Sequence, residues 1–189
     1  GADTTALGGE CAGVISAVGE GVTHLHVGDP VMAVATGSFA THVIAPAAFT
    51  TRMPANLSLQ QAASTLIPYI TAGYALEHLG QIKPGDRVLI HSGAGGVGLA
   101  AIQLARRAGA EIFASAGSPE KRAYLQSIGV QHVLDSRSLD FAAQVQRITA
   151  GRGVDLLLNS LAGAFIPAGL GIVAPNGHFL EIGKSDLLT

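Results

Sequence analysis

The sequence is poor in cysteine, aromatic residues and charge. Among 189 residues there is one cysteine, Cys11, no tryptophan, 5% aromatic residues and 13% charged residues. One cysteine excludes an intramolecular disulfide and a cysteine-rich structural zinc site, and it favours a reducing, cytoplasmic setting. The formal net charge is −2, and no run of lysine or arginine supplies the positive patch that nucleic-acid binding requires.

Long hydrophobic runs are also missing. Glycine, proline or charged residues interrupt each apolar stretch well before the roughly 20 residues that a membrane-spanning helix needs, so we expect no membrane segment. No secretory signal peptide is visible. The chain does contain 48% hydrophobic residues, which is enough to bury a substantial core. The composition therefore predicts a soluble globular protein.

The first part of the chain, residues 1–58, has the texture of β-structure. Glycine, aspartate and proline separate short alternating runs, which predict strands joined by turns. The predicted strands are 13–18, 31–35 and 39–44. From Ser58 the texture changes, because Ser58 can cap a helix that starts at Leu59, and helical periodicity continues over 70–79. The change predicts a domain boundary after residue 58.

Residues 59–189 contain a regular alternation of strands and helices. The predicted strands are 87–91, 111–115, 131–135, 154–159 and 178–182. The predicted helices are 96–108, 119–128, 138–150 and 161–171. This order indicates an α/β fold with a doubly wound parallel sheet of the Rossmann type. Both ends of the sequence are abrupt, so we expect a piece of a larger protein whose Rossmann domain is truncated at its C-terminal end.

A glycine-rich turn follows the first strand of this alternation and carries the strongest functional signal. In Gly93-x-Gly95-x-x-Gly98, the glycines allow a tight turn, close approach of a pyrophosphate, and packing of the helix on the sheet. Free N–H groups at the helix start stabilise phosphate charge. The motif predicts a dinucleotide-binding turn made of Gly93, Gly95, Gly96, Val97 and Gly98.

The end of the second strand favours NADP(H) over NAD. NAD-specific folds place an aspartate or glutamate there for the ribose 2′-hydroxyl, but residues 113–118 contain no acidic side chain. Ser118, followed by Lys121 and Arg122, suits a 2′-phosphate. The alternative is that the two basic residues only solvate a helix that begins at Pro119.

Residues 9–31 resemble the signature of the medium-chain dehydrogenase/reductase superfamily, with Glu10 followed by spaced glycines and a Gly-Asp turn. In the zinc-dependent alcohol dehydrogenases of that superfamily, a metal-binding histidine precedes this glutamate, whereas Gly9 stands here. The resemblance therefore implies a zinc-free member without metal ligands. His24 and His26 have a metal-like spacing, but no third ligand candidate is near in the sequence, and we expect them to be exposed loop residues.

Five further segments resemble the enoylreductase domains of modular polyketide synthases and animal-type fatty acid synthase. They are 7–13, 90–98, 117–125, 154–161 and 177–184. The resemblance covers essentially the whole chain. It implies that residues 1–58 are part of a GroES-like, β-rich substrate domain and that residues 59–189 form an NADP(H)-binding Rossmann domain.

The same resemblance implies an activity and partners. Enoylreductases use NADPH to reduce an α,β-unsaturated acyl thioester on an acyl carrier protein, beside other synthase domains in the same polypeptide. Three alternatives stay open: a free-standing zinc-independent NADPH:quinone or enone reductase, a silent cofactor-binding domain, and an enoylreductase diverted to cyclopropane formation. The oligomeric state also stays open, a dimer included.

The resemblance further implies roles for individual residues. Hydride goes to Cβ of the substrate and a proton to Cα, so an acid is needed unless solvent donates. Lys121 and Asp140 are the implied donor pair, with Asp135 as the weaker choice for the acid. Lys121 has a rival role at the 2′-phosphate. Asp140 can equally be a carboxylate that favours the first turn of a helix without taking part in chemistry.

Two more residues are candidates for contact with the cofactor. Thr71 matches the position at which family members touch the nicotinamide, and its alternative role is a helix N-terminal hydroxyl. Asn159 ends the fourth predicted strand, at the sheet edge where Rossmann folds bind their ligands. The alternative for Asn159 is the capping of a buried turn.

Overall fold

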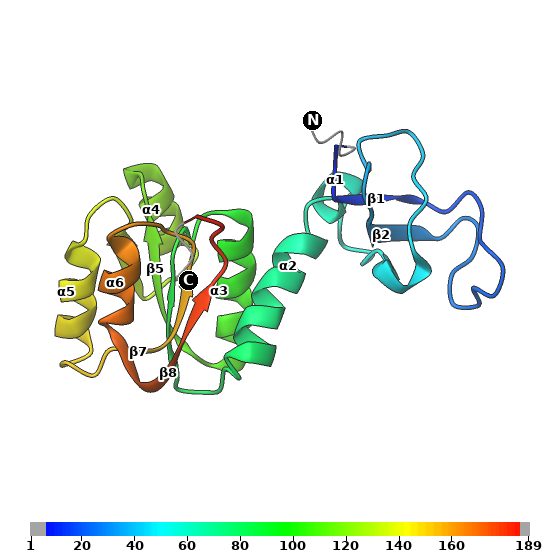
Figure 1. Cartoon of the computed structure of the whole chain (residues 1–189). Helices are drawn as coiled ribbons and strands as arrows, with labels where there is room; N and C mark the ends of the chain where they lie inside the picture. The colour runs from blue at the N-terminus through cyan, green and yellow to red at the C-terminus, as the bar shows by residue number, and fades with distance from the viewer. Residues whose placement is uncertain (1–6, 186–189) are drawn as a thin grey trace. The chain divides into compact units, whose positions relative to one another are not determined.

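The computed structural model describes residues 7–185, and its contacts divide the chain after Pro68 into two compact units (Figure 1). Unit 1 ends at Pro68, and unit 2 begins at Tyr69. The predicted ranges 1–58 and 59–189 also include residues 1–6 and 186–189, which lie outside the described residues. The predicted boundary after residue 58 precedes the observed one after Pro68, because helix α1 (Leu59–Ala62) still packs on a strand of unit 1.

Unit 1 contains a three-stranded antiparallel sheet in the order β1-β2-β3. Its elements are β1 (Glu10–Val14), β2 (Pro30–Val34), the short 3₁₀ turn η1 (Ala47–Phe49) and β3 (Thr50–Arg52). Of the predicted strands, 31–35 is confirmed by β2, and 13–18 overlaps only the end of β1. The prediction of a strand at 39–44 was wrong. β2 pairs with β1 on one side and with β3 on the other, and residues 39–44 pair with no strand in the described part of the chain.

The helix start predicted at Ser58 is confirmed. Ser58 Oγ accepts a hydrogen bond from Gln61 N at 3.2 Å, and Gln61 Oε1 accepts one from Ser58 N at 2.9 Å. This reciprocal pair is a capping box, and it satisfies two N–H groups that a helix start would otherwise leave free. The predicted helical stretch 70–79 is covered by α2 (Leu66–Gly73) and the π-helical η2 (Tyr74–Leu79).

Unit 2 is a five-stranded parallel sheet in the order β6-β5-β4-β7-β8, which confirms the predicted doubly wound fold. Its strands are β4 (Arg87–Ile90), β5 (Glu111–Ala116), β6 (His132–Asp135), β7 (Val154–Asn159) and β8 (Val173–Glu181). Its helices after η2 are α3 (Gly96–Ala108), α4 (Pro119–Ser127), α5 (Asp140–Ile148) and α6 (Phe165–Leu170).

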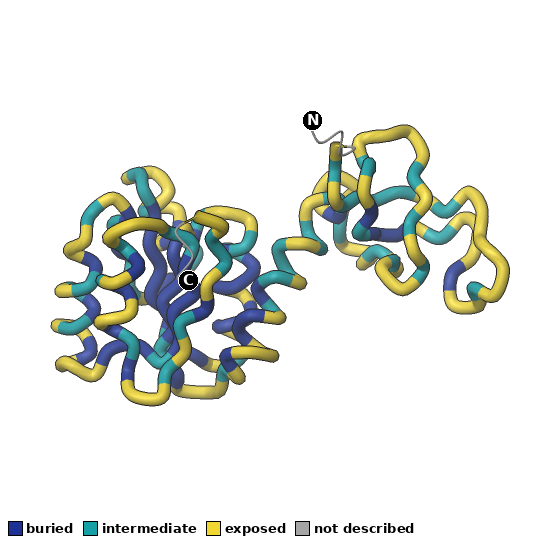
Figure 2. The backbone as a smooth tube through the Cα atoms, viewed as in Figure 1, coloured by how far each residue is buried: buried dark blue, intermediate teal, exposed yellow. Residues whose placement is uncertain are grey.

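Two apolar layers hold the sheet between its helices. Side chains of one strand alternate between the faces, so Val88 and Ile90 pack with η2, α3 and α4, whereas Leu89 packs with α5 and α6. Figure 1 shows α3 and α5 on opposite sides of the strands, and Figure 2 shows the buried strands in dark blue between them. Because both faces are covered, the strands are almost continuously apolar.

The last predicted helix and strand of unit 2 are shifted in the structure. The helix starts at Phe165 rather than at residue 161, because Gly163 has a left-handed φ of 62° that interrupts any earlier start. The last strand starts at Val173 rather than at residue 178, and its pairing with β7 is irregular between Val154 and Leu156. The helix predicted at 138–150 is shorter at both ends, as α5.

A polar cluster joins three strands at the amino ends of the sheet, and it permits a first test of the fold. Glu111 accepts hydrogen bonds from Arg87 Nε at 3.0 Å and pairs with His132 Nε2 at 2.8 Å. Burial alone would raise the pKa of Glu111, but hydrogen bonds from His132 and Arg87 outweigh it, so this pKa lies below its usual value. A lowered pKa means that the carboxylate stabilises the fold at neutral pH and that this stability is lost as pH falls.

We therefore expect Glu111→Gln to lower the free energy of unfolding at pH 7 by about 1 kcal/mol, a value kept small because the side chain is partly exposed. The difference from the unsubstituted protein should shrink at acidic pH, as Glu111 itself becomes protonated. Urea denaturation at pH 7 and at acidic pH measures the free energy of unfolding of both proteins. Glu20→Gln, at an exposed loop position, is the matched control. Equal losses for the two variants would contradict a role for the cluster.

Candidate cofactor site

The glycine turn lies at the carboxyl end of β4 and leads directly into α3. A Cβ atom on Gly98 would lie 2.6 Å from Gly93 Cα, and one on Gly93 would lie 2.9 Å from Ala114 Cβ. Both distances are too short for a side chain, so the helix approaches the strand as closely as it does only because these residues are glycines. Gly95 is the N-cap of α3, and no side chain caps it. The free N–H groups of this helix start can hold a pyrophosphate.

A buried histidine that was not predicted as a site residue lies between β4 and the glycine turn. His91 is 2% exposed, its Nδ1 lies 2.8 Å from Ser115 Oγ, and its ring meets Phe141 edge-on. Burial lowers the pKa of His91 to about 4, so the ring is neutral at pH 7. The hydrogen bond joins the carboxyl ends of β4 and β5. The sequence signal was a single polar residue between an apolar strand and the glycine turn.

At the end of β5, the structure separates the roles of the two predicted basic residues. Ser118 caps α4 by accepting a hydrogen bond from Lys121 N at 3.3 Å. Lys121 is exposed, and its ammonium group forms no ion pair with any residue in 7–185. Arg122 is engaged, because its Nη1 lies 3.1 Å from both Asp135 Oδ2 and the Ala116 carbonyl. Lys121 is therefore the basic residue of α4 that can receive an anion.

A second free cation, Arg137, lies beside this turn and was not predicted. A Cβ atom on Gly117 would lie 2.8 Å from Arg137 Nε, so the guanidinium group rests against the Gly117 backbone. The guanidinium pairs with no acidic side chain among the described residues. Arg137 follows β6, the neighbour of β5 in the sheet. Since parallel strands end at the same edge, its position after the third strand was the available signal.

The proposed donor residues Lys121 and Asp140 are not joined in the structure. Asp140 is the exposed first residue of α5, and its N–H donates to Ser138 Oγ at 3.1 Å. No ion pair links it to Lys121 within residues 7–185. Helices α4 and α5 cover opposite faces of the sheet. Asp135, the weaker choice, is bound to Arg122 and to the N–H of Arg137.

Thr71 and Asn159 differ in what their side chains contact. Thr71 lies inside α2 rather than at its start, is partly buried, and its hydroxyl has no hydrogen-bond partner in the described part of the chain. Asn159 is fully buried, and its amide binds Leu161 and Glu181. The next residue, Ser160, donates from its hydroxyl to Ser92 Oγ at 2.9 Å. These contacts tie the end of β7 to the glycine turn.

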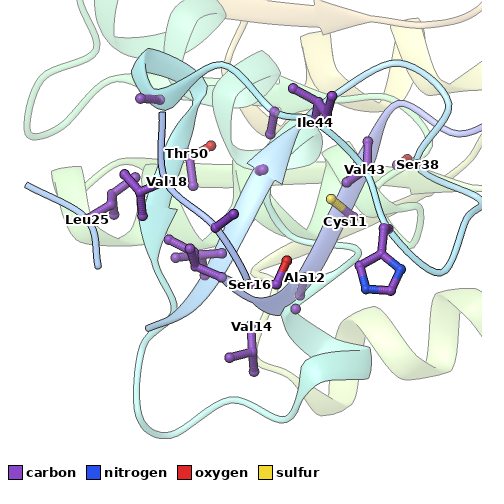
Figure 3. A pocket seen from close by; sticks show the side chains of 18 of the residues that line it. Cys11, Ala12, Val14, Ser16, Val18, Leu25, Ser38, Val43, Ile44 and Thr50 are labelled. Atoms are coloured by element: carbon purple, nitrogen blue, oxygen red, sulfur yellow. The ribbon is translucent and has the colours of Figure 1, made fainter. Parts of the chain in front are cut away.

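Unit 1 contains a hollow of about 730 Å³, lined mainly by small and apolar side chains (Figure 3). Its walls come from β1, β2 and the segment 40–45. None of the predicted cofactor residues lines it. Cys11 does line it, but burial, with the charge of Glu10, raises the pKa of the thiol, which therefore stays protonated and weakly reactive.

Two further findings concern metals and membranes. Within residues 7–185, no group of three or more histidine, cysteine, aspartate and glutamate side chains is arranged to hold a metal ion. His24 is exposed, and His26 lies 3.7 Å from Asp29. The described helices are all too short or too polar to cross a membrane.

Comparisons with known proteins match both units. Residues 3–55 match the family model of the alcohol dehydrogenase GroES-like domain, and residues 96–188 match that of the zinc-binding dehydrogenases. A mycocerosic acid synthase-like polyketide synthase of Mycobacterium tuberculosis is 51% identical over 182 residues, which are 96% of this chain and 9% of that protein. The chain thus spans a small part of the length of this relative.

Solved structures agree with these matches. The CurK enoyl reductase superposes with a TM-score of 0.95 at 46% identity, over 100% of this chain and 57% of that one. A putative enoyl reductase domain of a polyketide synthase is 50% identical over 65% of this chain and 70% of that one, with a TM-score of 0.62. Mycobacterial Rv1454c, solved as a complex with NADPH, is 33% identical over 96% of this chain and 58% of that one, with a TM-score of 0.88.

The folds of both units thus occur together in the CurK enoyl reductase, as the resemblance predicted. The relatives include an enoyl reductase, a protein solved as a complex with NADPH, and a polyketide synthase much longer than this chain. By sequence and structure, the chain belongs to the medium-chain dehydrogenase/reductase family and, within it, to the enoylreductase domains of polyketide synthases.

Proposed function

We propose that this chain is the reducing domain of a polyketide or fatty acid synthase. In this role it uses NADPH to saturate the α,β-double bond of an acyl thioester on an acyl carrier protein. The observation that carries the proposal is a glycine turn without a capping side chain, at the carboxyl edge of a sheet that also occurs in enoyl reductases similar to this chain. The cofactor supplies a hydride for Cβ of the substrate.

The choice of NADPH rests on the turn after β5. Arg137 rests against the backbone of Gly117, Ser118 and Lys121 lie at the start of α4 directly after it, and residues 113–118 carry no carboxylate that would repel a phosphate. Two unpaired cations and a hydroxyl match the charge and hydrogen-bonding needs of a 2′-phosphate. At the other half of the sheet, Thr71 lies on α2, which continues into η2 on β7 and β8, and we assign its free hydroxyl to the nicotinamide.

The surroundings of Lys121 favour the phosphate over proton transfer. Lys121 follows β5, which in Rossmann folds lies toward the adenosine half of the cofactor. Its use as a donor with Asp140 is the alternative. In that case each single alanine variant would lose about a hundredfold in turnover, the double variant would be little worse, and NADPH affinity would be unchanged.

We expect the protein to bind NADPH at least about tenfold more tightly than NADH, a difference of about 1.4 kcal/mol or more. Nicotinamide fluorescence titration of the intact purified protein measures both dissociation constants. Equal constants would contradict the assignment of the phosphate site.

The reaction itself is tested with two substrates. Oxidation of NADPH should accompany reduction of a carrier-bound enoyl thioester, with the saturated thioester as product. A free quinone should be a poor substrate. Activity with the quinone alone would instead favour an independent quinone reductase, and NADPH binding without either activity would favour a silent cofactor domain.

A further inference from the structure

Both donor hydrogens of the Asn159 side chain are used within the protein. Its Nδ2 donates to the Leu161 carbonyl and to Glu181 Oε2, each at 2.7 Å, and its Oδ1 accepts from Leu161 N at 3.3 Å. The residue is completely buried. An amide that has used both of its donor hydrogens acts on its neighbours rather than on a bound molecule.

Glu181, the partner of Asn159, also contacts the chain beyond β8. Glu181 is the last residue of β8, and its second oxygen, Oε1, accepts from Gly183 N at 2.6 Å. The backbone adds a third link, because Ile182 N donates to the Asn159 carbonyl at 3.0 Å. Residues 182–184 are therefore held against the carboxyl end of β7. We call these three links the Asn159–Glu181 clamp.

The clamp lies at the end of β7, which is one of the two strands between which the strand order reverses. In the order β6-β5-β4-β7-β8, the chain leaves β4 toward β5 and returns later to β7 on the other side. Dinucleotides bind across such a reversal, with one nucleotide over each half of the sheet. The adenosine half belongs to β5, so the nicotinamide half lies over β7 and β8. On the β4 side, the Ser160–Ser92 hydrogen bond joins the end of β7 to the glycine turn.

Resting on the proposed function, we propose that Asn159 and Glu181 are positioning residues for the nicotinamide half of the cofactor. They fix residues 182–184 beside the glycine turn, so that this segment forms a preformed wall for the nicotinamide ribose and ring. Asn159 itself does not touch the cofactor, which replaces its predicted direct contact with an indirect role. A rigid wall lowers the cost of ordering the segment when the cofactor binds.

The test compares two ligands of the intact purified protein. NADPH occupies both halves of the site, whereas adenosine 2′,5′-bisphosphate occupies only the adenosine half. Glu181→Gln keeps one acceptor oxygen but turns an amide group toward a hydrogen-bond donor, so one link of the clamp is lost. We expect this variant to bind NADPH about tenfold more weakly, which is the scale of one hydrogen bond to a charged group. Its affinity for the bisphosphate should change by less than about twofold.

A charge exchange tests whether the two residues act through each other. Asn159→Asp removes both donor groups and places a carboxylate against Glu181, so NADPH should weaken further than in Glu181→Gln. Adding Glu181→Gln to Asn159→Asp removes the repulsion and restores a donor, and we expect at least about threefold recovery of NADPH affinity. If the two residues acted independently, the losses of NADPH affinity in the two single variants would add in the double variant.

Glu111→Gln is the matched control, because it changes a hydrogen-bonded glutamate at the opposite edge of the same sheet. It should leave both affinities unchanged even though it lowers stability. Equal weakening of NADPH and the bisphosphate in Glu181→Gln, or no recovery in the double variant, would overturn the positioning role. Failure of the unsubstituted protein to bind either ligand would instead overturn the proposed function itself.

Discussion

Replacing both Lys121 and Arg137 by alanine is expected to weaken NADPH binding about a hundredfold, while NADH binding changes by less than about twofold. Both cations are exposed and unpaired, Arg137 against Gly117 and Lys121 in the first turn of α4, and each would form a charge-assisted hydrogen bond with the 2′-phosphate. Such bonds contribute about 1.5 kcal/mol or more apiece. NADH lacks the phosphate, so the affinity for NADH should not depend on either side chain. Fluorescence titration of both cofactors measures the effect.

Arg147→Ala is the control for net charge, because Arg147 is exposed near the end of α5 and away from the turn after β5. It should change the ratio of the two affinities little. The NADPH affinity of the unsubstituted protein should also fall with salt more steeply than that of the double variant, since exposed charges are screened. Parallel loss of NADPH and NADH in the double variant would refute the phosphate site.

The free energy of unfolding is expected to fall by about 3 kcal/mol between pH 7 and pH 4 through His91 alone. Burial lowers the pKa of His91 from 6.5 to about 4, so the folded state resists a proton that the unfolded state accepts. The histidine therefore stabilises the fold fully above pH 6.5, and this stability is lost as pH falls toward 4. Urea denaturation at half-unit steps of pH follows the change.

In His91→Gln the stability should vary much less over this range, although the variant will be less stable at pH 7 because the ring also packs on Phe141. His24→Gln, at an exposed loop position, should retain the full slope. The pH range of this change also separates His91 from Glu111, because the stability that Glu111 contributes is lost at lower pH than that of His91. A His91→Gln variant that loses stability with pH as steeply as the unsubstituted protein would exclude this origin.

The regular part of the fold was readable from periodicity alone. The strand 154–159 and the helix 96–108 have the predicted limits, because apolar alternation and the glycine turn are local signals. The run 39–44 failed for a non-local reason. Alternation shows that a segment can be a strand, but a strand forms only where another strand pairs with it, and β1 and β3 pair with β2 and not with residues 39–44.

The candidate site was predictable where it follows from the motif and not where it follows from contacts. Gly93 and Gly98 are crowded in the way that their spacing implied. Arg137 and His91 depend on which strand ends lie side by side, and the sequence does not display this until the strand order is known. Asn159 was placed correctly at the carboxyl end of its strand, but its bond to Glu181 spans residues far apart in the sequence.

The contact between Gly117 and Arg137 has a consequence for the evolution of cofactor preference. An acidic residue at the end of β5 is the common route to NADH, yet a side chain at position 117 would enter the space of the Arg137 guanidinium. The new carboxylate would be neutralised by that arginine before it reached a ribose hydroxyl. Under the proposed preference for NADPH, a change to NADH would therefore require the loss of Arg137 first, through an intermediate that binds both cofactors poorly.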